Sequence, residues 1–260
     1  MNNFKFAYAT TNDINDIITL MKNEFPKFTL EKSIYGTNKI NQYLKLSITE
    51  KYSNKKRIVC KSRNRIIGYI EGICNKDKFH INYIAVDSEF RRKNIGKRLI
   101  ENIIKSLDKG INKISIHVYK HNFNALNWYL KLGFKIINEK NIFEITTDST
   151  IENSCKDIFI LNYPQFKIEY ENFEFSYLKI QFKSEEFLIG VLGARYFRVN
   201  NVELLNNSKI IGFLNSIDSN RKIIISSEYK FNFNENISEV KFIGKNYYLE
   251  IDKDSLIEKL

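Results

Sequence analysis

The residues best suited to chemistry lie between Ile84 and Phe134. An apolar, β-rich segment ends there in a basic run, and the next apolar residues, Ile95, Leu99, Ile103 and Leu107, recur every four positions. This pattern predicts a strand, a turn and a helix. A turn that leads into a helix N-terminus presents backbone N–H groups and the positive end of the helix dipole, which favour phosphate. The positive side chains around the turn strengthen this prediction: Arg91, Arg92, Lys93, Lys97 and Arg98.

A second pattern follows downstream. An alternating strand pattern at ISIHV precedes a helix that is predicted to begin near Asn122 and to end at Gly133. Together the two stretches resemble the GNAT superfamily of acetyl-CoA-dependent N-acyltransferases. The cofactor motif of that family, Arg/Gln-x-x-Gly-x-Gly/Ala, falls on residues 91–96, with Asn94 in place of the first glycine. Asn adopts positive φ more readily than other non-glycine residues, so it can maintain the turn. The second signature falls without departure on Asn122, Ala125, Tyr129, Gly133 and Phe134.

The resemblance implies roles for these residues. Acetyl-CoA would be held by the turn, by main-chain groups at the end of the fourth strand, and by Asn122, which is also expected to cap its helix. Tyr129 matches the family's general acid, a phenol close to the cofactor sulfur that protonates the departing thiolate. The expected cofactor-binding residues are Ile84, Ala85, Val86, Arg91, Arg92, Lys93, Asn94, Ile95, Gly96, Lys97, Asn122 and Tyr129.

The general base is less clearly marked. Several family members place a Glu five residues before the Ala that ends the fourth strand, and here that position is His80. Imidazole has an ordinary pKa of ~6.5 and can take a proton from an ammonium group directly or through water. Asn82 would lie on the same strand face and could orient His80. The alternatives are Glu71 on the preceding strand and, with less support, His117 and His121 on the next one.

The acceptor side is expected from the same resemblance. The loop between the first two helices and the nearby strand ends hold the acceptor in the family. Glu24, Phe25, Tyr35 and Tyr43 are therefore acceptor-side candidates, although a residue of each type more often serves packing or lies at the surface.

Composition indicates a globular protein. Its 260 residues are 43% hydrophobic, and a formal net charge of +11 suits anionic ligands such as CoA, although a lysine-rich composition alone also produces it. Cys60, Cys74 and Cys155 are widely spaced and no signal-peptide pattern precedes them, so we expect reduced thiols in a cytoplasmic protein. No apolar run reaches the ~20 residues of a membrane-spanning helix. No metal site is expected.

The resemblance implies an α/β (α+β) fold for residues 1–164: a mixed, mostly antiparallel central sheet flanked by helices, closed by a final strand at residues 157–163. Residues 165–260 alternate like strands around one helical stretch and predict a smaller α+β domain without a chemical motif. This domain could dimerise, complete the acceptor pocket or be a degenerate second acyltransferase-like half. No internal repeat is evident in the sequence.

Two functional hypotheses follow. The first is an N-acetyltransferase that passes the acetyl group of acetyl-CoA to a primary amine through a tetrahedral intermediate. The acceptor would be a protein N-terminus, a lysine or a small-molecule amine. The second is a non-catalytic acyl-CoA-binding or nucleic-acid-binding module. Retention of Tyr129 and of the full second signature favours the enzyme. We expect no membrane partner and no nucleic-acid partner, since no reader motif is present, and homodimerisation stays open.

Overall fold

The computed structural model describes residues 4–51, 53–148, 157–228 and 237–260. The chain divides into two units. The first comprises Met1–Leu30, Asn41–Asn138 and Tyr247–Leu260, and the second comprises Glu31–Ile40 and Glu139–Asn246. This division differs from the expected one at residue 164, because each unit draws on segments that are far apart in the sequence.

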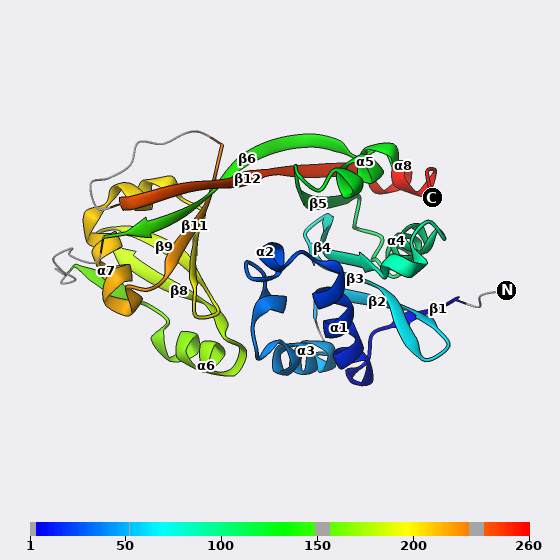
Figure 1. Cartoon of the computed structure of the whole chain (residues 1–260), viewed down its shortest axis with the longest axis horizontal. Coiled ribbons are helices and arrows are strands. Elements are labelled where there is room, and N and C mark those ends of the chain that lie inside the picture. Colours follow the sequence, from blue (N-terminus) through cyan, green and yellow to red (C-terminus); the bar gives the residue numbers. More distant parts are fainter. Residues whose placement is uncertain (1–3, 52, 149–156, 229–236) are drawn as a thin grey trace. The chain divides into compact units, whose positions relative to one another are not determined.

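The first unit is built around a sheet with the strand order β1-β2-β3-β4-β5-β12-β6. The strands are β1 Phe4–Tyr8, β2 Lys55–Ser62, β3 Arg65–Asn75, β4 Lys78–Val86, β5 Lys113–Tyr119, β6 Lys135–Thr147 and β12 Ile237–Asp252. The helices are α1 Ile14–Glu24, α2 Lys27–Leu30, α3 Ile40–Thr49, α4 Ile95–Lys105, α5 Phe123–Lys131 and α8 Lys253–Ile257, with 3-10 turns η1 Thr11–Asp13 and η3 Ser88–Phe90. Helices α1 and α3 lie on one side of β2–β4 and α4 lies on the other (Figure 1).

Pairing in this sheet is antiparallel from β1 to β4, whereas β4 and β5 run parallel because α4 connects them. The core of the unit forms where the apolar faces of α4 and α5 pack on these strands, through Leu99, Ile103, Leu126, Ile81 and Ile114 among others. The four-residue spacing in α4 puts Ile95, Leu99 and Ile103 on the buried side of that helix, as the sequence predicts.

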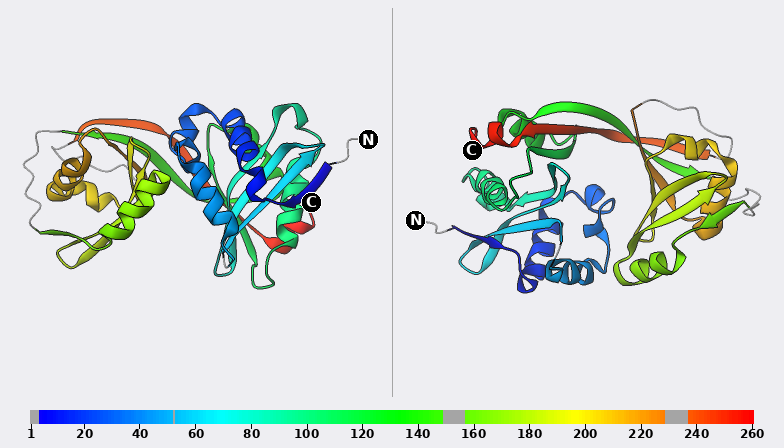
Figure 2. Two further views of the ribbon diagram at one scale, coloured as in Figure 1. Left: turned by 90° about the horizontal axis from the view of Figure 1, so that it is seen from below. Right: turned by 180° about the vertical axis from the view of Figure 1, so that it is seen from behind.

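The second unit has its own core, and its part of the same 12-stranded sheet has the order β7-β8-β9-β10-β11-β6-β12. Its elements are β7 Ile158–Ile160, α6 Tyr163–Phe173, β8 Phe175–Phe182, β9 Glu185–Leu192, β10 Tyr196–Val199, α7 Ser208–Asp218 and β11 Lys222–Ser227, with the 3-10 turns η2 Ile34–Gly36 and η4 Val202–Asn206. The boundary between the units falls within β6 and β12, two long strands that are neighbours in the sheet (Figures 1 and 2).

The second unit repeats the topology of the first. Four antiparallel strands, β7 to β10, are followed by a helix and a strand parallel to β10, just as β1 to β4 are followed by α4 and β5. A shared ion-pair arrangement supports the correspondence: Glu250 contacts Lys113 at the start of β5, and Glu144 contacts Lys222 at the start of β11. Of the alternatives open for residues 165–260, the structure thus shows a second half with the same fold.

The strand expected at residues 157–163 does not close the first unit. It lies in the second unit and pairs with a strand there. Residues 158–160 form β7, which pairs with β8 in the second unit. The place between β5 and β6 is taken by β12. Strand β12 is one continuous strand over Ile237–Asp252. The expectation was wrong because an alternating pattern predicts a strand but does not identify its neighbours.

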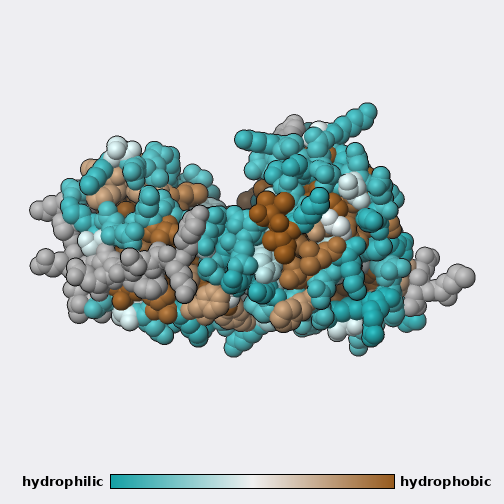
Figure 3. All heavy atoms as spheres, turned by 90° about the horizontal axis from the view of Figure 1, so that it is seen from above, coloured by the Kyte–Doolittle hydropathy of each residue, from teal (hydrophilic) through white to brown (hydrophobic). Residues whose placement is uncertain are grey.

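On the face shown in Figure 3 most residues are hydrophilic, and hydrophobic residues gather in patches. No helix in the described part of the chain is long and apolar enough to cross a membrane. Cys60 is a buried free thiol whose pKa burial raises to about 11, and Cys74 is a half-buried free thiol. Cys155 lies outside the described residues.

Candidate active site

The basic turn before α4 has an unusual backbone. The sign of φ alternates along the turn. Arg92 and Asn94 have positive φ values of 60° and 59°, whereas φ is −63° at Arg91 and is also not positive at Lys93. Such alternation of φ directs successive N–H groups toward one concave side, a known anion-binding arrangement. Asn94 is the N-cap of α4 in the left-handed conformation, as expected for a residue that replaces the first motif glycine.

The N-terminus of α4 is open. The side chain of Asn94 makes no capping hydrogen bond. In the described part of the chain, no side chain accepts a hydrogen bond from the amides of Ile95, Gly96 or Lys97. The first amides of a helix have no acceptor within the helix, so these three donors are available to an external anion. The turn therefore combines free donors with the positive end of the helix dipole.

Gly96, the second motif glycine, also has a packing role. A Cβ atom at this position would lie 3.2 Å from Cζ2 and 3.3 Å from Cη2 of Trp128 on α5. The glycine thus lets the indole ring approach the first turn of α4 closely. This contact joins the two signatures of the sequence in space.

The charged side chains around the turn differ in how they are used. Arg91 bonds to Glu24 at 2.5 Å and donates to the Val86 carbonyl at 3.2 Å, so it ties the turn to α1 and β4. Lys93 lies over the Phe90 ring at 4.7 Å, and Lys97 donates to the carbonyl of Lys259 at 3.0 Å. Arg92 is exposed and has no ion pair among the described residues, which leaves its charge available to an anion.

Strands β4 and β5 separate next to this turn. Their pairing runs from Lys78–Lys113 to Ile81–Ile116 and ends there, although β4 continues to Val86 and β5 to Tyr119. The β3–β4 register shifts at the same level, between Glu71 and Gly72, which is a β-bulge. Within the described parts of the chain, the β5-facing edge of Ile84, Ala85 and Val86 consequently has no strand partner, as main-chain binding of an extended ligand requires.

Helix α5 begins as the sequence predicts. The Asn122 side chain is the N-cap and accepts a hydrogen bond from the amide of Ala125 at 3.3 Å. Four residues farther on, Leu126 packs into the core, and Gly133 follows the helix with φ 91°. The second signature thus sets the start and the end of the helix that carries Tyr129.

Tyr129 combines a buried ring with a protonated hydroxyl. Its ring is 2% exposed and packs edge-on against Phe134 with centroids 5.3 Å apart. Burial raises the pKa of the phenol above its usual value, so the hydroxyl keeps its proton at neutral pH. Within the described residues Asn246 Oδ1 is the only buried side-chain polar atom without a partner. The Tyr129 hydroxyl has no hydrogen-bond partner among the described residues.

His80 lies in a polar cluster on β4, β5 and β12. Its Nδ1 atom is 2.9 Å from Ser115 Oγ, and its ring centroid is 5.1 Å from that of His117 and 6.2 Å from that of Tyr248. Burial, helped by the nearby His117, lowers the pKa of His80 to about 4, so its imidazole is neutral at pH 7. Asn82, expected to orient His80, is exposed at the bulge and forms no hydrogen bond with it.

Glu71 lies apart from that cluster, in the interior. Its Oε2 atom accepts hydrogen bonds from Arg57 Nε at 2.8 Å and from the Tyr69 hydroxyl at 2.6 Å, and the residue is 1% exposed. Arg57 also bonds to the carbonyl and the hydroxyl of Ser47 on α3. This arrangement favours a structural ion pair between sheet and helix. His121 is exposed and stacks on Tyr119 with centroids 5.1 Å apart.

The acceptor-side candidates are dispersed. Glu24 accepts from Arg91 and from the amide of Ser88, and Phe25 packs edge-on against Tyr83. Tyr43 lies under the ammonium of Lys55 at 4.9 Å. Tyr35 is fully buried in the second unit, where the segment Glu31–Ile40 is held by contacts such as Lys32 to Glu144 at 3.4 Å.

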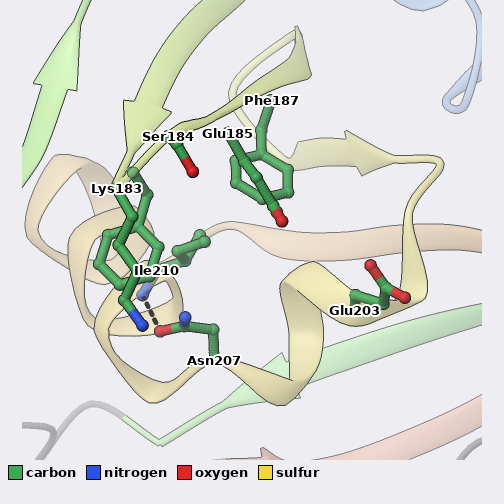
Figure 4. Close-up of a pocket in the computed structure, with 8 residues that line it drawn as sticks. Lys183, Ser184, Glu185, Phe187, Glu203, Asn207 and Ile210 are labelled. Carbon is green, nitrogen blue, oxygen red and sulfur yellow. Dashed lines mark hydrogen bonds between the residues drawn. The ribbon is translucent and has the colours of Figure 1, made fainter.

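The corresponding helix of the second unit begins differently. Asn207 is the N-cap of α7, and its Oδ1 accepts from the amides of Lys209 at 3.1 Å and Ile210 at 3.4 Å (Figure 4). A pocket of about 180 Å³ adjoins this helix start and is lined by both Lys183 and Glu185. Because the Asn207 side chain accepts from these amides and the pocket carries both charges, the start of α7 does not present the free amide donors that the described residues leave at the start of α4.

Sequence reasoning missed some residues of the site. Ser115 and Tyr248, which contact His80, were not singled out, and neither was the positive φ of Arg92. Alternation along ISIHV places Ser115 and His117 on one strand face, which was a usable signal for Ser115. No sequence signal could have indicated Tyr248, because it comes from the distant strand β12.

Comparison with known proteins bears on the sequence at residues 16–134 and on the fold. The model of the Acetyltransferase (GNAT) family matches residues 16–134. A putative acetyltransferase from Pyrococcus horikoshii is 12% identical, with a TM-score of 0.66 over 97% of this chain and 90% of its own. A tandem GNAT protein from the clavulanic acid biosynthesis pathway is 11% identical, with a TM-score of 0.61 over 96% of this chain and 99% of its own. An N-acetyltransferase from Sphaerobacter thermophilus is 8% identical, with a TM-score of 0.59 over 96% of each chain.

Sequence identities this low show similarity of fold alone. Because these three structures cover 96–97% of this chain, the similarity of fold includes both units. The family match covers the turn before α4, the separating strands β4 and β5, and helix α5 with Tyr129. The chain therefore carries an acetyltransferase domain of the GNAT family at residues 16–134, within a fold that repeats the GNAT arrangement, and it is an acyltransferase.

Proposed function

We propose that the protein transfers the acetyl group of acetyl-CoA to a primary amine, on a protein or on a small molecule. The observation that carries this proposal is the open start of α4 next to the unpaired edge of β4. The free amides of Ile95, Gly96 and Lys97, with the charge of Arg92, would hold the pyrophosphate. The edge of Ile84, Ala85 and Val86 would pair with the pantetheine arm, and family membership supports acetyl-CoA as the co-substrate.

The reaction would proceed by direct attack. The ammonium group loses a proton to the polar cluster on β4 and β5, and the amine nitrogen then bonds to the thioester carbon. Main-chain N–H groups on β4 would stabilise the oxyanion of the tetrahedral intermediate. When the carbon–sulfur bond breaks, the Tyr129 hydroxyl donates its proton to the thiolate, and the second proton that the attacking nitrogen must lose to become an amide restores the phenol. A phenol with a raised pKa is a weak acid, but a thiolate that forms in a dry site is a strong proton acceptor.

The test begins with binding. We expect acetyl-CoA to bind one-to-one in calorimetric titration of the whole chain, and a screen of amines to release free CoA thiol. Arg92→Glu should weaken acetyl-CoA binding by about tenfold, equivalent to ~1.4 kcal/mol. Lys183→Glu makes the same charge change beside α7 in the second unit and serves as the matched control.

The outcomes separate the hypotheses. Equal loss of affinity in both variants would show a nonspecific effect of net charge. Absence of acetyl-CoA binding in the unmodified chain would refute the proposal. Binding without thiol release from any amine would instead support the non-catalytic acyl-CoA-binding alternative.

A further inference from the structure

The carboxylate of Glu24 connects helix α1 with the segment that leads to the basic turn. Glu24 is the last residue of α1, and its side chain is only 9% exposed. Its Oε1 atom accepts a hydrogen bond from the amide of Ser88 at 3.0 Å, and its Oε2 atom accepts one from Nη2 of Arg91 at 2.5 Å. The Nε atom of Arg91 donates to the Val86 carbonyl at 3.2 Å. One carboxylate thus joins α1, the end of β4, η3 and the turn.

The stability of α1 does not explain an acid at this position. The C-terminal end of a helix carries the negative end of the dipole, so a carboxylate there is disfavoured, whereas a cation such as Lys22 in the same turn is favoured. A carboxylate that is largely withdrawn from water also needs hydrogen bonds to replace its hydration. Ser88 and Arg91 supply those hydrogen bonds. The contacts of Glu24 therefore serve the segment that contains its two donors.

That segment has a backbone that must be held in place. Arg92 and Asn94 have φ values of 60° and 59°, and neither residue is a glycine. Residues in this conformation persist where the surrounding contacts determine it. At the far end of the turn, α4 holds the backbone, because the amide of Arg98 donates to the Asn94 carbonyl at 3.1 Å. At the near end, the side chain of Arg91 bonds to Glu24 and ties the turn to α1.

We propose that Glu24 is a positioning residue for acetyl-CoA: through Arg91 and Ser88 it holds the turn before α4 in the conformation that binds the pyrophosphate. Arg91 then serves the cofactor as a tie within the protein, and the contact with the anion is left to Arg92 and the first amides of α4. Glu24 thereby has a role on the cofactor side, in place of the acceptor-side role expected from its position in the sequence. This proposal rests on the proposed use of acetyl-CoA.

The first experiment is calorimetric titration of the whole chain and of Glu24→Gln with acetyl-CoA. A carboxamide has one oxygen and an NH₂ group, so one of the two donors that Glu24 satisfies loses its acceptor. If the fraction of chains with a binding-competent turn falls to about a tenth, the apparent Kd rises about tenfold. By charge alone, loss of a carboxylate near an anion site should strengthen binding. A positioning role and a simple charge effect therefore predict changes of opposite sign.

Asp16→Asn is the matched control, because it makes the same charge change at an exposed position in the first turn of α1. We expect its affinity to equal that of the unmodified chain. A Glu24→Gln affinity equal to that of Asp16→Asn, or higher, would overturn the proposal. In a double-mutant cycle, Glu24→Gln and Arg91→Met together should lose less affinity than the sum of the two single losses, since both remove the same bond. Additive losses would show that Glu24 does not act through Arg91.

The second experiment needs neither cofactor nor turnover. Hydrogen–deuterium exchange in a peptide that contains residues 88–95 should be faster in Glu24→Gln than in the unmodified chain and in Asp16→Asn, because the turn opens more often. Equal exchange in all three proteins would refute the ordering of the turn by Glu24. If the unmodified chain bound no acetyl-CoA while exchange differed as expected, the proposed function would fail and the ordering by Glu24 would be supported, so the two failures are distinguishable.

Discussion

His80 makes the stability of the protein depend on pH in a calculable way. In the folded protein its pKa is about 4, against 6.5 for an ordinary histidine. Between these values the unfolded chain binds a proton at this position and the folded chain does not, so stability is present above pH 6.5 and is lost as pH falls toward 4. One pKa unit corresponds to ~1.36 kcal/mol.

The magnitude follows from those two values. Between pH 7.5 and pH 5.0 the proton binding of the unfolded chain should cost the folded state about 2 kcal/mol, and solvent around this half-buried ring makes that an upper estimate. Urea unfolding followed by circular dichroism at the two pH values measures the loss. His80→Gln removes the titrating group but keeps an acceptor for Ser115.

The prediction is tested by comparing the loss of stability between pH 7.5 and pH 5.0 in the unmodified chain and in two variants. The unmodified chain should lose about 2 kcal/mol more than His80→Gln between the two pH values. His121→Gln is the matched control, because His121 is exposed and should leave the loss unchanged. Equal pH dependence in the unmodified chain and in His80→Gln would refute the argument that burial and His117 keep His80 neutral.

Other predictions concern single residues. Asn94→Gly should preserve or improve acetyl-CoA affinity in calorimetry, because glycine adopts φ 59° without strain; a marked loss would show that the Asn94 side chain makes a contact of its own. Tyr129→Phe should lower kcat and leave acetyl-CoA affinity nearly intact; a large loss of affinity would make it a binding or packing residue. Glu71→Gln should cost ~3 kcal/mol of stability in thermal unfolding, since Arg57 is left buried without its counter-ion. Gly72→Ala should destabilise by ~1–3 kcal/mol, because its Cβ would lie 2.5 Å from the His80 carbonyl oxygen; melting temperatures near that of the unmodified chain would contradict both.

The sequence predicted well what depends on local spacing. The turn and helix at 91–105, the cap at Asn122 and the end near Gly133 follow from residue types that act within one or two turns of chain. The positive φ of Asn94 was expected for the same reason. These features need no information on distant segments, and the structure confirms them.

Partners that come from distant segments could not be predicted. Glu71 is a suitable base by type and position, and only the fold shows Arg57 and Tyr69 bonded to its carboxylate. The repeated topology of the two units was not visible in the sequence for a related reason. Many different sequences satisfy the apolar pattern that a fold needs. Lys113 and Lys222 can therefore occupy equivalent positions in the two units although the sequences around them are not recognisably similar.

The position of β12 in the first unit determines when that unit can finish folding. During synthesis β1 to β6 leave the ribosome early. Strand β12, which lies between β5 and β6, spans Ile237–Asp252, and its part in the first unit begins only at Tyr247. Until then the facing edges of β5 and β6 lack their partner and are open to wrong pairing. Contacts of such long sequence separation also slow folding. A fragment of residues 1–164 would keep every signature residue and still expose those edges, so we expect it to aggregate instead of acting as a smaller enzyme.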